Sequence, residues 1–165
     1  MLVKGQKVDV TKGRNVSELA VHFGWKCDNA RIGIDAAGFV LSERGKCERD
    51  EHFVFYGNPH GFGGAVTHSA AEGEDREAIR ISLQSVPEAA DKIALTVTIH
   101  EGEKQGHTMK DVSGLYVRLV DAAAGEEIGR FDFGADFGME TAVVAGELYR
   151  YQGEWKFRAV GSGFF

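Results

Sequence analysis

Acidic side chains gather at three places in this chain and are its best candidates for chemistry. In chain order they are Asp35; Glu48, Asp50 and Glu51; and Glu72, Glu74, Asp75 and Glu77. The second and third groups stand directly before apolar alternating segments, and Asp35 stands inside one. Calcium takes about six to eight oxygens from carboxylates, carbonyls and water, usually from loops that meet at one end of a fold. The three groups could supply such a site; a solvated acidic rim that keeps the protein soluble is the reading that composition alone favours.

The sequence gives little support to other chemistries. It contains no Walker-type phosphate loop, dinucleotide fingerprint or nucleophile elbow, and the Gly-rich stretch 61–64 lacks the lysine and following helix of a phosphate loop. The histidines have no zinc-ligand spacing, and His22 and His100 fall on the polar phase of their segments, as surface residues do. Asp75 and Glu77, two apart on a strand, would share a face and could act as acid and base, but nothing marks a substrate. The chain is therefore predicted not to be an enzyme.

Period-two alternation of apolar and polar residues dominates the chain and predicts strands. The clearest segments are 19–25, 79–83, 93–99 and 115–119, and further strands are expected at 31–41, 53–56, 128–133, 141–151 and 155–160. Short helical turns are expected near 87–90 and 109–112. About ten short strands separated by turn signals predict an all-β, two-sheet β-sandwich, with a closed barrel as the alternative.

Length and charge set further bounds. A chain of 165 residues without a linker or internal repeat is expected to form one domain, residues 1–165. The net charge of −6, from 25 acidic and 19 basic residues, repels a phosphate backbone, so nucleic acid is not an expected partner. There is no apolar signal core and no apolar run of about 20 residues, which argues against membrane insertion. Together with the low cysteine content, this predicts a cytoplasmic protein with reduced thiols.

The end of the chain, residues 146–164, is predicted to form a hairpin and resembles the close of the TerD family, the tellurium-resistance and stress-response domains. Segments 2–12, 34–41, 50–58 and 75–79 are similar to further parts of that family, in the same order along the whole chain. The resemblance implies a β-sandwich that binds calcium at one edge and protects bacteria against tellurite and other stresses. No enzymatic turnover is established for members of that family, so the resemblance implies a protein that is not an enzyme. The partners that it implies are related TerD-type domains or membrane-associated stress-complex proteins.

The resemblance carries a calcium site over onto this chain only in part. The residues that keep the family's acids are Asp35, Asp50, Asp75 and Glu77, with Glu72 and Glu74 as possible substitutes. Gly33 stands where the family has its first strand acid, Arg76 replaces the middle acid of its third segment, and 69–73 is a shortened loop without the usual Asp-Asn pair. A calcium site that is weakened or lost is the expectation, and a calcium-independent interaction scaffold is the alternative.

Overall fold

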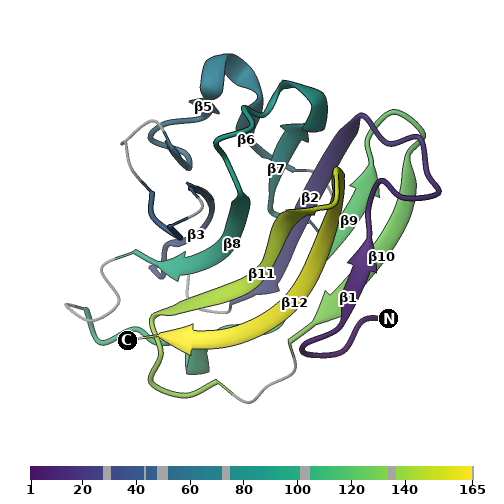
Figure 1. Ribbon diagram of the computed structural model, residues 1–165. Helices are drawn as coiled ribbons and strands as arrows, with labels where there is room; N and C mark the ends of the chain where they lie inside the picture. The colour runs from purple at the N-terminus through teal and green to yellow at the C-terminus, as the bar shows by residue number, and fades with distance from the viewer. Residues whose placement is uncertain are drawn as a thin grey trace.

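The computed structural model describes residues 1–27, 31–42, 44–47, 52–71, 75–100, 105–133 and 137–164. Over these ranges the chain forms twelve strands in two six-stranded sheets. Neighbouring strands pair in the antiparallel sense throughout. In Figure 1, β8, β11 and β12 of one sheet lie in front of β2, β7 and β9 of the other. The all-β, two-sheet fold predicted from alternation is confirmed.

The first sheet contains both chain ends and the predicted C-terminal hairpin. Its strands, in spatial order, are β1 (Lys7–Asp9), β12 (Glu154–Phe164), β11 (Ala142–Tyr151), β8 (Lys92–Ile99), β3 (Ile34–Leu41) and β4 (Phe53–Val54). The short β4 pairs with β3 only at Gly38 and Phe39. The rest of that edge of β3 is therefore left for other partners.

The second sheet is built around β2. Its strands, in spatial order, are β10 (Glu126–Asp132), β9 (Ser113–Asp121), β2 (Glu18–Lys26), β7 (Glu77–Ser82), β6 (Val66–Ala70) and β5 (His60–Gly61). Register places His22 opposite Arg118 on one side and opposite Ala78 on the other. Polar residues of β2 and β9 are thus brought side by side on one face, with the small Ala78 of β7 beside them.

The core lies between the sheets and takes the apolar phase of each strand. Phe23, Ile79 and Leu95 are fully buried there, as is Phe157 of the closing hairpin. Burial of such side chains contributes roughly 1.5–3 kcal/mol each. The opposite phase of each strand is left on the outer faces, where His22 and Arg118 lie.

Three 3₁₀ turns lie wholly within the described residues: η2 (Phe62–Gly64), η3 (Leu83–Ser85) and η4 (Met109–Asp111). The turn predicted near 109–112 is confirmed as η4. The one predicted near 87–90 is wrong, because that stretch is a β-turn in which the Ala90 amide donates to the Pro87 carbonyl at 3.0 Å. No helix in the described ranges has the length and hydropathy that a membrane span needs.

Candidate functional site

Asp75, directly before β7, lies on the outer face of the second sheet and is held by two residues of β9. The Tyr116 hydroxyl donates to Asp75 Oδ1 at 2.5 Å. Arg118 donates from Nε to Oδ1 at 3.2 Å and from Nη2 to Oδ2 at 2.6 Å. Asp75 is 8% exposed, so this is a nearly buried, two-pronged ion pair. Such charge-assisted bonds are among the strongest in proteins.

Protonation in this cluster follows from burial and the ion pair. Burial alone would raise the pKa of Asp75, but the hydrogen bonds from Arg118 and Tyr116 bring that pKa below its ordinary value. Burial, followed by the hydrogen bond to Asp75, raises the pKa of Tyr116 to about 12. Burial lowers the pKa of His22, even though its Nδ1 lies 3.4 Å from Asp75 Oδ2. Near neutral pH the cluster thus holds an ionised Asp75 and a protonated Tyr116.

The Tyr116 ring is fixed between a glycine and a guanidinium group. A Cβ on Gly24 would lie 2.1 Å from ring atom Cε1, so the backbone of β2 can approach the ring only without a side chain there. Arg130 packs over the ring at 4.0 Å from its centroid, and Asp132 accepts a hydrogen bond from Arg130 Nη2 at 3.0 Å. The hydroxyl is therefore aimed at Asp75 by packing as well as by its hydrogen bond.

Glu77, the first residue of β7, has its side chain at the seam between the sheets. Its Oε1 accepts the backbone amide of Ala36, on β3 of the other sheet, at 3.0 Å. The same oxygen lies 2.5 Å from Nε2 of His68 on β6. Because β4 does not reach Ala36, the Glu77 carboxylate satisfies an edge amide that has no strand partner. We call Asp35, Ala36, His68 and Glu77 the sheet corner.

Asp35 belongs to this corner because the amide bound by Glu77 is that of the next residue. Asp35 is half-buried, and burial raises its pKa, while His100 and His68 act in the opposite direction. The cation that replaces a family acid, Arg76, is engaged at the end of β2: its Nε donates to the Trp25 carbonyl at 3.2 Å.

The structure therefore separates two acids that the sequence grouped together. Glu77 bridges to the strand of Asp35, whereas Asp75 is turned onto the outer face, so the two do not share a face as alternation suggested. Three predicted ligands, Asp50, Glu72 and Glu74, lie outside the described residues. Within the described ranges there is no group of three or more His, Cys, Asp or Glu side chains arranged to hold a metal ion. The metal assignment stays a prediction.

Sequence reasoning missed Tyr116, Arg118 and His22 as partners of Asp75. His22 was expected to be an ordinary surface residue, but its side chain is 22% exposed and lies against Asp75. The available signal was the polar phase of the strands at 19–25 and 115–119. That phase predicts outward-facing residues, but strand order and register are needed to show that they are neighbours.

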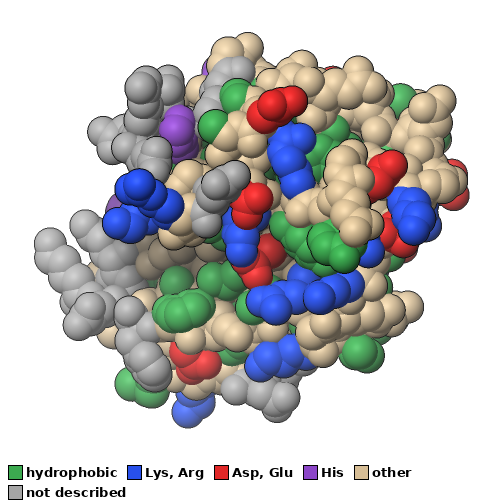
Figure 2. Space-filling model, in the orientation of Figure 1, with side chains coloured by type: hydrophobic (Ala, Val, Ile, Leu, Met, Phe, Trp, Pro, Cys, Tyr) green, Lys and Arg blue, Asp and Glu red, His purple; other side chains and the backbone are tan. Residues whose placement is uncertain are grey.

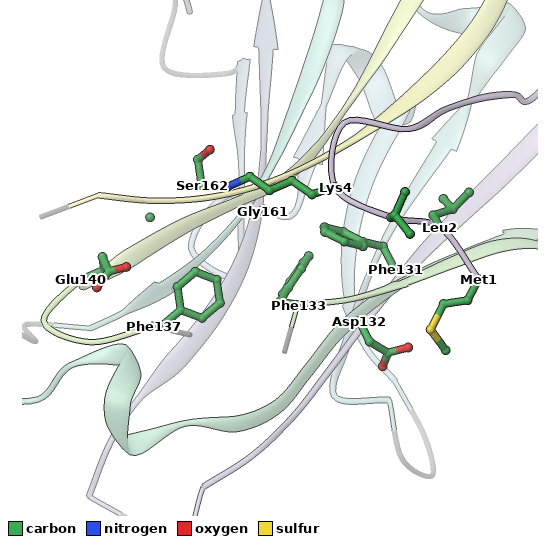
Figure 3. A pocket seen from close by; sticks show the side chains of 12 residues that line it. Met1, Leu2, Lys4, Phe131, Asp132, Phe133, Phe137, Glu140, Gly161 and Ser162 are labelled. Carbon is green, nitrogen blue, oxygen red and sulfur yellow. The ribbon is translucent and has the colours of Figure 1, made fainter. Parts of the chain in front are cut away.

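Another hollow, of about 680 Å³, lies elsewhere, between the N-terminal segment, the end of β10 and β12. Figure 3 shows Phe131, Phe133 and Phe137 along it, with Leu2 next to Phe131. Phe131 and Phe133 meet edge to face at 4.8 Å between ring centroids. Its carboxylates already have partners: Asp132 binds Arg130, and Glu140 Oε1 accepts the Gly138 amide at 2.8 Å. The hollow therefore combines aromatic side chains with carboxylates that are already bound, and no metal-ligand group was found there among the described residues.

Two antiparallel six-stranded sheets with a polar cluster on one outer face define a β-sandwich protein. The TerD domain family matches residues 1–165, and the chain belongs to this family. It is 41% identical to general stress protein 16U of Bacillus subtilis and 39% identical to tellurium resistance protein TerD of Serratia marcescens. Each alignment covers 99% of this chain and 90% of the relative.

A solved structure of a homologue of telluride resistance protein (TerD) from Streptomyces coelicolor A3(2) has the same fold. Its TM-score is 0.70 at 19% identity, over 91% of each chain. Likeness at that identity supports the fold alone. The family is therefore established by sequence, and its named roles are tellurium resistance and stress response.

Proposed function

We propose that this protein is a non-enzymatic, cytoplasmic stress-response module that binds Ca²⁺ at the sheet corner. It acts in assemblies with related TerD-type domains or membrane-associated stress proteins. The observation that carries the calcium proposal is the Glu77 carboxylate, which spans the two sheets beside the half-buried Asp35. Resistance to tellurite or chemical stress is supported by the names of the relatives.

The chemistry of the corner suits a hard cation. Burial raises the pKa of Asp35, and a divalent ion beside it would oppose that effect by favouring the ionised form. Both contacts of Glu77 use Oε1. Because calcium takes about six to eight oxygens, two carboxylates need further ligands, for which Asp50, Glu72 and Glu74 are the predicted sources. Asp75 is not part of this proposal, because both of its oxygens are bound by Arg118.

The polar cluster on the outer face supports the non-enzymatic reading. Efficient acid–base catalysis needs a group whose pKa lies near the working pH. The pKa of Asp75 is lowered and that of Tyr116 is raised to about 12, so these two groups are moved away from neutrality in opposite directions. The cluster is suited to hold charge in place rather than to exchange protons.

Thermal unfolding of chelator-treated protein, with millimolar Ca²⁺ or Mg²⁺ added back, tests the calcium proposal. Ligand at about 100 times Kd stabilises by roughly 2.7 kcal/mol, which raises Tm by roughly 5–11 °C for a chain of this size. Asp35→Asn and Glu77→Gln are expected to lose most of the calcium-specific rise. Asp75→Asn, the matched control, is expected to keep it.

The same experiment has two contrary outcomes. The absence of any calcium-specific rise in the parent would contradict the proposal. Loss of the rise in Asp75→Asn alone would place the ion on the other face.

A calcium-independent scaffold is the second candidate, and one observation favours it. Both acids already have partners within the protein. Asp75 is bound by Arg118, and Glu77 is bound by the Ala36 amide and by His68. Size-exclusion chromatography with a related TerD-type domain separates the two candidates. Assembly that survives EDTA unchanged supports the scaffold, and assembly that EDTA abolishes supports the calcium-dependent module.

A further inference from the structure

Two hollows lie side by side on the outer face of the second sheet. The first, about 420 Å³, has a floor of small side chains: Ala20 and Ala78 are each 4% exposed and Val120 is 7% exposed, although all three point out of the sandwich. The second, about 350 Å³, lies beside Tyr116. Asp75 lines the first hollow and Tyr116 lines the second. The hydrogen bond from the Tyr116 hydroxyl to Asp75 joins the two residues where the hollows meet.

This face carries positive charge in a chain whose net charge is −6. The Lys and Arg side chains that line the two hollows are Lys26, Arg76, Arg80, Arg118 and Arg130. The carboxylates among the lining residues are Asp75 and Asp132, and each is held by an arginine. Two further carboxylates contact these cations: Glu18 lies 3.4 Å from Arg80, and Glu127 lies 3.6 Å from Arg118. We call these five cations, with the hollows between them, the basic face.

The outer face of the first sheet is different. Figure 2 shows blue and red side chains interspersed there. Glu147 on β11 pairs with Arg158 at 2.8 Å and with Lys92 at 3.5 Å, and Lys156 pairs with Asp9 at 3.4 Å. Each of these three cations thus has a carboxylate neighbour on that face.

Several of these cations are held in fixed positions. Arg118 is clamped by Asp75, Arg130 lies between Tyr116 and Asp132, and Arg76 donates to the Trp25 carbonyl. Fixing a long side chain before binding removes part of the entropy that a partner would otherwise have to overcome. Arg80, in contrast, is 51% exposed and has only a 3.4 Å contact with Glu18, and Lys26 is exposed. These two are available to a partner.

We propose that the basic face binds an extended acidic segment of a partner protein, with carboxylate side chains entering the two hollows. Arginine forks match carboxylates, and complementary charge sets specificity and the rate of encounter. Both hollows open onto one sheet face, which suits a chain lying across strands better than an enclosed small molecule. This inference deepens the assembly part of the proposed function and rests on it, while the calcium site at the sheet corner is separate.

The test uses a fluorescein-labelled, glutamate-rich decapeptide and the full chain, with binding followed by fluorescence anisotropy at low salt. The variant Arg80→Glu/Lys26→Glu reverses one exposed charge beside each hollow. The control Lys7→Glu/Lys12→Glu makes the same change in net charge at exposed residues away from the basic face. We expect at least a ~10-fold weaker Kd for the first variant and less than a ~2-fold change for the control. Arg80→Ala/Lys26→Ala should give a smaller loss in the same direction.

Four outcomes would overturn the inference. They are no binding of the peptide to the parent, equal weakening by both charge reversals, full competition by millimolar inorganic phosphate or free glutamate, and tighter face-dependent binding of a single-stranded oligonucleotide. Calcium stabilisation and assembly are measured on the same samples. If the peptide does not bind but calcium stabilisation and assembly are both observed, this inference alone is refuted. If the parent protein does not assemble with a TerD-type domain, the proposed function is refuted.

Discussion

Replacing Asp75 by Asn tests whether this acid supports the fold rather than a metal. The substitution keeps the size of the side chain but removes the charge that accepts the two Arg118 bonds and the Tyr116 bond. Leaving one partner of a buried ion pair unmatched costs about 3–5 kcal/mol. Arg118 is 29% exposed, so water recovers part of that cost, and a loss of about 2–4 kcal/mol is expected. For a chain of this size that lowers Tm by roughly 4–16 °C.

Asp35→Asn is the internal comparison, because the change in Tm expected for it is opposite in sign to the change expected for Asp75→Asn. Burial raises the pKa of Asp35, which means that its ionised form destabilises the folded state at neutral pH. Without a metal ion, the neutral amide should leave Tm unchanged or raise it. Both variants are therefore measured by calorimetry at pH 7 in chelator.

The dependence on pH supplies a second check on Asp75. Its pKa is lowered in the folded state, so its contribution is complete above the unfolded pKa of about 3.9 and is lost as pH falls through the folded value. The gap in Tm between parent and Asp75→Asn should persist from pH 7 to about pH 5 and shrink below about pH 4. Equal Tm values for parent and Asp75→Asn at pH 7 would refute this reasoning.

Two more substitutions probe the same cluster. Gly24→Ala places a Cβ against the Tyr116 ring and should cost about 1–3 kcal/mol by chemical denaturation; a similar cost in a Tyr116→Ala background would show that the ring is not responsible. His22→Gln should flatten the fall of Tm below about pH 6.5, because burial lowers the pKa of His22 and the unfolded chain takes up the proton first. An unchanged slope between about pH 5 and 6.5 would argue against that burial effect.

Alternation predicted the layered fold well because period-two burial is a strong local signal. The segments 19–25 and 93–99 fall within β2 and β8 with their apolar phase inside. The short strands β1, β5 and β6 were missed, because strands of two to five residues carry little periodicity. β1 and β5 are edge strands, and β6 is next to an edge. The strand predicted to run to Leu83 ends at Ser82, where the 3₁₀ turn η3 begins.

The candidate sites were predicted less well, because their partners depend on strand order. Sequence spacing placed Asp75 beside Glu77, but the strand begins only at Glu77, so the shared-face rule does not reach Asp75. Register then brings Arg118 next to His22, which no local pattern could reveal. The sequence therefore identified Asp75 as a candidate residue but did not identify its partner Arg118.

The start of β7 divides these acids between two surfaces, and this explains how Arg76 can replace an acid there. The Arg76 amide donates to the Phe23 carbonyl at 2.7 Å and its side chain to the Trp25 carbonyl, so this residue is anchored along the end of β2. A cation among several carboxylates around one metal ion would compete with that ion. With Asp75 already neutralised by Arg118 on the outer face and Glu77 turned to the seam between the sheets, Arg76 instead adds to the basic face. Arg76, the residue that weakens the resemblance to a calcium site at this point of the chain, therefore contributes to the surface that we assign to an acidic partner.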